Sequence, residues 1–485
     1  MNQDLTASWT LEGIPAYEGG VLAPALYDCG KRFFKHGDDP RALLQAIAHT
    51  DAAQFDAYVK KLAQAGFAIE SDNMLEANRY VTAYDGATRV YASFAAAEAS
   101  ARVVKDISLI SPDGFSQNES GDGEAMFCLF GLNRDAGGHN RKFDEPEWDL
   151  NKTDECNAGL LMVIRCTDNS LILIDGGITS QMTGVEGVCE PNAPMRRLDA
   201  FLRKLTATPD GERIRIACWY MTHADSDHYQ GLYNFLKEYS NSYTLERFCS
   251  NIPATSAWEP LDRVGAYLGE TYPECRELKL HTGQKFTLAG VTLQAIYTHE
   301  DDVDPETGIG RHRDNNSSSL VMRVSAKDMS MLILGDATSA TSRVLQENFT
   351  NRTLGVDIMQ VAHHGFNNVK GLYDVICADH ALFPQAQYGV YKDYPQNIPN
   401  PPAPDTIRNI YQSVVNSNPN GIQVYFEVYY ADRDSTDLSA VVDAKDVTDP
   451  VNSPLFYQTH TWGFSAREGK PTLVLHDIDV FPNRR

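Results

Sequence analysis

The segment His223-Ala-Asp-Ser-Asp-His228 constrains this chain more than any other part of its sequence. Two imidazoles and two carboxylates directly follow an apolar run, residues 214–222, that is typical of a buried strand. Residues 231–239 carry apolar side chains at helical spacing, so we expect a helix to begin near Asp227 or His228. Nitrogen and oxygen donors that converge at a strand end are what a divalent metal ion requires. The segment therefore predicts a metal site.

A short motif of this kind is also typical of a solvated surface turn, so its surroundings decide its meaning. Three further apolar runs end in residues that bind metals: strand 171–174 before Asp175, strand 331–334 before Asp336, and strand 356–362 before His363 and His364. Taken singly, Asp-Gly after a strand is ordinarily a turn, and paired histidines are ordinarily surface or core residues. Four such strand ends in one chain predict a single site at one edge of a sheet.

Length and charge limit the classes of protein to consider. A chain of 485 residues predicts two or three domains. The net charge of −23 disfavours binding to nucleic acid and to anionic lipid. The amino terminus lacks a signal-peptide pattern, and no apolar run is long enough to span a membrane. Nine scattered cysteines without a CxxC pair favour reduced thiols, so we expect a cytoplasmic protein. The oligomeric state stays open.

We predict a small α+β accessory domain over residues 1–115 and a second domain over residues 123–485. In the first, Asp51 to Gln54 resembles a capping box, and the following helix should end at Gly66. Asp85-Gly86 predicts a hairpin turn. Residues 111–123 have the composition of a loop and should form the domain boundary.

In the second domain, predicted strands alternate with predicted helices. Further strands are expected at 125–130, 160–165, 286–297 and 319–324, and helices at 195–205 and 404–414. Two polar or aromatic insertions, residues 133–157 and 384–404, should shape the specificity of the site. The second insertion includes a proline-rich stretch, residues 395–404.

The strand-end motifs together resemble those of the metallo-β-lactamase fold superfamily of hydrolases. Its first motif resembles Leu171–Gly177, its HxHxDH signature resembles Thr222–His228, and its strand with a metal-bridging aspartate resembles Leu332–Asp336. The chain is still more similar to the ComEC-like branch, on account of the HxDxDH variant, Asn316–Val321 and Val361–Gly365. The resemblance covers residues 123 to 480 and implies an α+β fold, an αβ/βα sandwich of two mixed sheets.

The resemblance also implies two divalent metal ions. His223, Asp225 and one of His363 and His364 would hold one ion. Asp227, His228 and Asp336 would hold the other, with Asp336 bridging, and a metal-bridged hydroxide would be the nucleophile. We expect Asp227 and His364 to be the catalytic residues, and Asp175 to orient a histidine through its ring N–H. Zinc is the expected ion, while the oxygen donor Asp225 favours manganese or iron as alternatives.

One feature of the ComEC-like branch is missing. A late Gly-His-Pro motif has no counterpart in residues 384–395. One metal position would therefore be weakened, completed by Tyr388 or Lys392 through water, or empty. The nearby His380 falls within a predicted strand, and we interpret it as structural.

The sequence therefore favours a binuclear metallohydrolase that acts on a small ester, with a phosphodiester preferred because two metals suit displacement at phosphorus. A carboxylic ester or lactone hydrolase on the same site is the alternative. From other classes, a metal-binding scaffold that has lost catalysis and recognises a partner remains open. A redox di-iron site is disfavoured by the lack of a flavin-binding partner domain.

Overall fold

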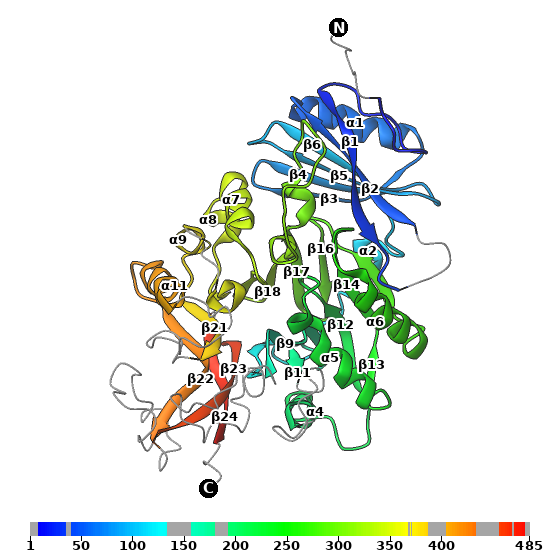
Figure 1. Cartoon of the computed structure of the whole chain (residues 1–485). Helices are drawn as coiled ribbons and strands as arrows, with labels where there is room; N and C mark the ends of the chain where they lie inside the picture. Colours follow the sequence, from blue (N-terminus) through cyan, green and yellow to red (C-terminus); the bar gives the residue numbers. More distant parts are fainter. Residues whose placement is uncertain are drawn as a thin grey trace.

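The protein is described by a computed structural model. The structure describes residues 8–34, 40–132, 157–179, 193–366, 369, 371–386, 404–432, 455–467 and 470–480. Figure 1 shows a smaller sheet at one end of the molecule and a much longer sheet, flanked by helices on two sides, in the remainder. The predicted insertion 133–157 lies almost wholly outside the described residues, as do most of 384–404 with Tyr388 and Lys392.

The smaller sheet has six antiparallel strands, and one helix packs against it. Its elements are β1 (Val21–Lys31), β2 (Arg41–Ala48), α1 (Ala52–Gln64), β3 (Ala68–Leu75), β4 (Asn78–Tyr84), β5 (Arg89–Ala95) and β6 (Ser100–Asp106), and the strand order is β1-β2-β6-β5-β4-β3. Helix α1 begins with the predicted capping box, in which Asp51 accepts from the Gln54 N–H. Phe55, Tyr58 and Leu62 of α1 then pack on one face of the sheet.

Two features of this region differ from the sequence prediction. Strands β1 and β2 were not predicted, because β1 contains Pro24 and Gly30 and its burial does not alternate regularly. Residues 111–123, predicted to be a loop, include a single helical turn, α2 (Pro112–Phe115). Ser111 caps this turn, and Phe115 packs edge-on against Phe286 at 4.5 Å. The division into domains at 1–115 and 123–485 stays a prediction.

The longer sheet is mixed and has 16 strands within the described residues. Its path is β15-β14-β12-β10-β9-β7-β23-β22-β21-β20-β19-β18-β17-β16, with β13 beside β12 and β24 beside β23. The strands of its first half are β7 (Met126–Leu129), β9 (Leu161–Arg165), β10 (Leu171–Asp175), β12 (Ile214–Tyr220), β13 (Tyr243–Leu245), β14 (Arg247–Ser250) and β15 (Arg276–Lys279). Those of its second half are β16 (Lys285–Leu288), β17 (Val291–Tyr297), β18 (Val321–Ala326), β19 (Met329–Ile333), β20 (Ile358–Gln360), β21 (His380–Ala386), β22 (Gln423–Asp432), β23 (Leu455–Arg467) and β24 (Lys470–Val480).

The two halves face each other as the layers of a sandwich. One hydrophobic core lies between them, with Ile172 and Ile174 from β10 and Met331 and Ile333 from β19. The alternate residues of β10, such as Leu173, point outward into a second core. The α+β class and the αβ/βα sandwich are confirmed. The two mixed sheets are, however, joined into one by hydrogen bonds between β7 and β23.

Helices cover both outer faces of the sandwich (Figure 1). One outer layer consists of α4 (Ala193–Thr206), α5 (Ser226–Glu238) and α6 (Trp258–Thr271), and the other of α7 (Ser339–Asn348), α8 (Asn351–Leu354), α9 (Leu372–Ile376) and α11 (Pro404–Asn416). The helix predicted near Asp227 is α5, which begins one residue earlier. None of the described helices is long and apolar enough to cross a membrane.

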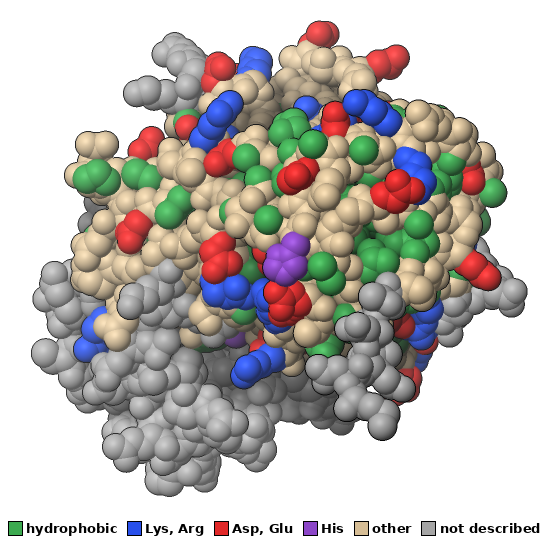
Figure 2. Space-filling view, turned by 90° about the horizontal axis from the view of Figure 1, so that it is seen from above, with side chains coloured by type: hydrophobic (Ala, Val, Ile, Leu, Met, Phe, Trp, Pro, Cys, Tyr) green, Lys and Arg blue, Asp and Glu red, His purple; other side chains and the backbone are tan. Residues whose placement is uncertain are grey.

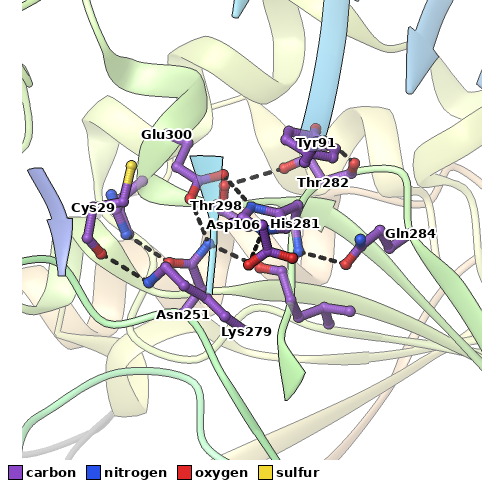
Figure 3. A network of polar contacts seen from close by, with 12 residues as sticks. Cys29, Tyr91, Asp106, Asn251, Lys279, His281, Thr282, Gln284, Thr298 and Glu300 are labelled. Atoms are coloured by element: carbon purple, nitrogen blue, oxygen red, sulfur yellow. Dashed lines mark hydrogen bonds and ion pairs between the residues drawn. The ribbon is translucent and has the colours of Figure 1, made fainter. Parts of the chain in front are cut away.

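A buried ion cluster, defined here as Asp106, Lys279, His281 and Glu300, lies between the six-stranded sheet and the longer one (Figure 3). His281 Nδ1 is 2.7 Å from Glu300 Oε2, and its Nε2 is 3.2 Å from Asp106 Oδ1. The ring of Tyr91, from β5, stacks on His281 at 4.4 Å. The Lys279 ammonium donates to the Cys29 carbonyl of β1 over 2.7 Å. Charged groups thus join the two sheets.

The face of the molecule seen from the end of the six-stranded sheet mixes side chains of all kinds (Figure 2). Basic groups lie beside acidic ones across this face. Among the described residues of this face, the positive charge is therefore paired locally rather than gathered into a patch that would attract a polyanion.

Candidate metal site

Parallel strands bring the predicted site residues to one edge of the sandwich. β10 pairs in parallel with β12, and β19 pairs in parallel with β20, so within each pair the carboxyl ends meet. The residues after these ends are Asp175, the segment 223–228, Asp336 and the pair His363 and His364. The two halves are tied together here, because the Leu320 N–H donates to the Thr222 carbonyl over 2.9 Å.

Gly335 lies where three of these segments converge. Its φ of +54° is left-handed, and a Cβ at this position would lie 3.0 Å from Thr222 Cβ and 3.2 Å from Ser319 Oγ. Its carbonyl accepts a hydrogen bond of 3.0 Å from the His363 N–H. This glycine therefore allows the β12, β19 and β20 segments to approach each other immediately before Asp336.

One group of ligand atoms is formed by Asp227, His228, Asp336 and His364, whose donor atoms all lie within 4.8 Å of one another. Oδ1 of Asp336 is 3.2 Å from His228 Nε2 and 3.5 Å from His364 Nε2. Oδ2 of Asp227 is 3.5 Å from the same His364 nitrogen. These four side chains provide two nitrogen and two carboxylate donors around one point.

A second group forms on the other oxygen of the same carboxylate. Oδ2 of Asp336 is 3.5 Å from His363 Nε2 and 3.9 Å from His223 Nε2. Asp225 Oδ2 is 3.5 Å from that His223 nitrogen. The structure thus places His363 in one group and His364 in the other, with Asp336 between them.

The backbone at His363 and His364 explains how two consecutive side chains reach two different groups. Both residues adopt left-handed conformations, with φ of 47° and 50°. Such conformations are unfavourable for residues with a Cβ, by about 1 kcal/mol or more each. Asp175 is also left-handed, with φ of 59°. Left-handed backbone at these three residues stores strain within the site.

Buried hydrogen bonds hold two of the imidazoles from behind. Asp175 Oδ2 accepts from His228 Nδ1 at 2.7 Å and from the Thr222 hydroxyl at 2.7 Å. Because the single proton of that hydroxyl is given to Asp175, the Thr222 oxygen must accept from His223 Nδ1, 3.0 Å away. Both histidines therefore carry their structural N–H on Nδ1 and direct Nε2 into the site.

The site carries strong opposing charges. Burial lowers the pKa of His228, but the carboxylates of Asp336, Asp175 and Asp227 raise it well above its ordinary value. Burial likewise lowers the pKa of His364, but Asp336 and Asp227 raise it to about 10. Burial raises the pKa of Asp336, yet His228 and His364 hold it well below its usual range. The carboxylates are thus ionised and require nearby positive charge.

The buried polar atoms of the site fit metal ligands. Nε2 of His223, Nε2 of His228, Nε2 of His364 and Asp336 Oδ1 are buried and make no hydrogen bond within the described residues. A buried polar atom without a partner is unfavourable by about 1–3 kcal/mol, so several at one point indicate a missing ligand. Imidazole nitrogens and carboxylate oxygens are the donors that zinc, manganese and iron take.

One side of the site is open. The side chains of Asp225, Asp227 and His363 are 36, 34 and 22% exposed, whereas those of His223, His228 and Asp336 are at most 2% exposed. Solvent therefore reaches the site from the side of Asp225, Asp227 and His363. His363 also packs edge-on against Phe366, with 5.9 Å between the rings.

The structure brings together every described residue that the sequence analysis assigned to the site. His380 lies instead at the start of β21, with its ring 5.2 Å from that of Phe464. Three residues around the site were given no role by the sequence analysis: Thr222 and Ser319, which lie within the quoted motifs, and Asn315, which does not. The polar run Asn315–Ser319 was the available signal for two of them, although the resemblance used it only from Asn316 onward. The roles of the site residues stay predictions.

The fold and the site together define an αβ/βα sandwich with a histidine–aspartate cluster that can hold metal ions. No family model matches the chain, and no curated protein matches it. Among solved structures, it is similar to CmlA, a diiron β-hydroxylase from Streptomyces venezuelae, with 12% identity and a TM-score of 0.34 over 62% of this chain and 52% of CmlA. The match therefore spans about half the length of CmlA.

Two further similar structures are Zn²⁺-bound PqqB from Methylobacterium extorquens and a putative metal-dependent hydrolase from Parabacteroides distasonis. PqqB has 11% identity and a TM-score of 0.30, over 48% of this chain and 71% of PqqB. The hydrolase has 10% identity and a TM-score of 0.28, over 56% of this chain and 90% of its own. These likenesses are weak, with TM-scores of 0.34 or less.

Proposed function

We propose that this protein is a metal-dependent hydrolase that holds two divalent ions and acts on a small ester, with a phosphodiester as the first candidate. The observation that carries the proposal is the position of Asp336, whose two carboxylate oxygens face two different sets of histidine nitrogens. A carboxylate shared in this way is suited to bridging two adjacent ions. His223, Asp225 and His363 would hold one ion, and Asp227, His228 and His364 the other.

The charges of the site support two ions rather than one. Asp175, Asp225, Asp227 and Asp336 bring four negative charges, and the four histidines are neutral when they act as ligands. Two divalent cations would balance those four charges. Without such cations, protons on His228 and His364 must supply part of the balance, which agrees with their raised pKa values.

Divalent ions bound here would supply Lewis acidity to the substrate oxygen and lower the pKa of a water molecule. Asp227 lies next to the open side, where its second carboxylate oxygen would orient an attacking water toward the substrate, while His364 would hold the ion beside it. His223 and His228 are held by Thr222 and Asp175 and do not reorient. The substrate enters past Asp225 and Asp227, whose negative charge would disfavour a polyanion unless metal is bound.

The experiment measures metal content per chain by elemental analysis together with hydrolysis of bis-p-nitrophenyl phosphate. The variants are Asp227→Ala and, as a matched control, His380→Gln, which changes a histidine outside the site. We expect about two equivalents of metal and turnover in the parent and in the control, and loss of turnover in Asp227→Ala. The same measurement identifies the ion as zinc, manganese or iron.

The alternatives correspond to separate outcomes. Metal with turnover of a carboxylic ester or lactone, but not of the phosphodiester, would replace the substrate class and keep the site. Metal without turnover of any ester would favour a scaffold. Absence of metal after reconstitution with zinc, manganese and iron would contradict the proposal. Placement in the ComEC-like branch and a cytoplasmic location remain expectations from the sequence.

A further inference from the structure

We infer that Asn315 is a positioning residue for the first metal group: its side-chain amide holds the Asp225 carboxylate so that a single oxygen faces the ion. This inference rests on the proposed function. Asn315 Nδ2 donates to Asp225 Oδ1 over 2.7 Å, while Asp225 Oδ2 is the atom that lies 3.5 Å from His223 Nε2. One oxygen of Asp225 is thus occupied by the amide, and the other is directed toward the ligand nitrogen of His223.

The orientation of the Asn315 amide follows from its two partners. Its nitrogen must face Asp225, because an ionised carboxylate accepts hydrogen bonds and cannot donate one. Its oxygen Oδ1 then accepts from the Ser256 hydroxyl over 3.0 Å, and Ser256 is buried. The chain Ser256–Asn315–Asp225 therefore has a defined direction, and each bond strengthens the next.

The backbone that carries Asn315 is itself held rigidly. Asn315 precedes a short 3-10 helix, residues 316–318, but its side chain does not cap that helix. The Ser318 hydroxyl donates to the Asn315 carbonyl over 2.6 Å. The Ser317 hydroxyl accepts from the Asp314 N–H and donates to the Asp314 carbonyl. Asn315 thus stands at a helix-capping position, but its side chain contacts Asp225 rather than the helix. The loop that carries it is fixed in place.

The same polar run also contacts the backbone of the residue that carries the shared carboxylate. Ser319 Oγ accepts from the Asp336 N–H over 3.1 Å. Asn315 and Ser319 therefore connect one short segment to Asp225 and to Asp336, which belong to opposite halves of the sandwich. Asp225 is 36% exposed and would otherwise be free to rotate. Fixing a ligand through a partner outside the metal shell typically changes metal affinity about 10- to 100-fold.

The test titrates zinc into metal-stripped protein by calorimetry for the parent, Asn315→Ala, Asn315→Asp and Ser256→Ala. We expect Asn315→Ala to weaken one of the two zinc equivalents about 10- to 100-fold and to leave the other unchanged. Asn315→Asp should weaken the same equivalent further, because it places one carboxylate against another. Ser256→Ala should have a smaller effect, since the bond to Asp225 remains. The matched control is Asn351→Ala, which removes a comparable side-chain donor that is bonded to the distant Val375 carbonyl.

A double-mutant cycle separates positioning from a general structural role. If Asn315 acts through Asp225, then Asn315→Ala in an Asp225→Ala background should cause no further loss of zinc affinity. Additive losses would overturn the inference, as would parent-like zinc affinity in Asn315→Ala. If the parent binds two zinc equivalents and Asn315→Ala binds them with the same affinity, this inference fails and the proposed function stands. A parent that binds no zinc, manganese or iron would overturn the proposed function as well.

Discussion

The Asp175 carboxylate lies 2.7 Å from His228 Nδ1, and both side chains are fully buried. Asp175 also accepts from the Thr222 N–H and hydroxyl, so three donors meet at this one side chain. Through Thr222 it is connected to His223 as well. A single buried carboxylate thus orients one histidine from each of the two proposed metal groups.

Replacing this carboxylate tests its orienting role. Asp175→Asn should lower zinc affinity about 10- to 100-fold, because the amide cannot accept from all three donors in the same way. The metal-free protein should also lose about 1–3 kcal/mol of stability, since a buried donor is left unpaired. Zinc titration and thermal unfolding of the stripped protein measure the two effects. Unchanged zinc affinity would show that Asp175 serves the fold alone.

The two neighbouring histidines should have separable effects. His363→Ala should weaken the ion held with His223 and Asp225, and His364→Ala the ion held with Asp227 and His228. Each variant is therefore expected to retain about one equivalent of metal, whereas Asp336→Asn, which alters the shared carboxylate, should retain less. Elemental analysis after dialysis measures the content. The assignment of the groups fails if one histidine variant keeps both ions.

Crowding at Gly335 provides a third prediction. Gly335→Ala should destabilise the protein and weaken zinc binding, because the added Cβ would meet Thr222 Cβ at 3.0 Å and displace the neighbouring Asp336. Gly66→Ala is the matched control: Gly66 also has a positive φ, but apart from its chain neighbours no described atom lies within 4 Å of the added carbon. It should cost about 1 kcal/mol of stability and leave zinc affinity intact. Equal zinc affinities in both variants would count against this role of Gly335.

The buried ion cluster predicts a loss of stability at alkaline pH. Burial lowers the pKa of His281, but Glu300 and Asp106 raise it from 6.5 to about 9. Because the folded state binds this proton more tightly than the unfolded state, the stabilisation is fully present below about pH 6.5 and is lost as the pH rises through 9. Lys279 and Arg89 are further cations that act on these carboxylates, Lys279 on Glu300 and Arg89 on Asp106.

The measurement is the urea midpoint between pH 6 and 10, in the presence of a chelator, for the parent and His281→Gln. The difference between the two proteins should be largest near pH 6 and should shrink toward pH 10. A difference that does not change with pH would mean that His281 is neutral in the folded protein.

Local patterns were sufficient to predict much of the fold. Short apolar runs in the sequence indicated four strands, β10, β12, β19 and β20. A change in the spacing of apolar residues, from that of a strand to that of a helix, indicated the start of α5. The capping box of α1 was visible because its bonds span only three residues. β1 and β2 were not, because an irregular strand is stabilised by its partners in the sheet rather than by its own residues.

The sequence by itself thus determined which side chains stand at the strand ends, since that depends on neighbouring residues in the chain. Only the tertiary structure decided that Asp336 faces both groups, that His363 and His364 belong to different ones, and that Asn315 reaches Asp225. It also decided that β7 and β23 join the two halves. These contacts join residues far apart in the sequence, and their geometry is set by how the two halves pack and by three left-handed backbone positions that no local pattern predicts.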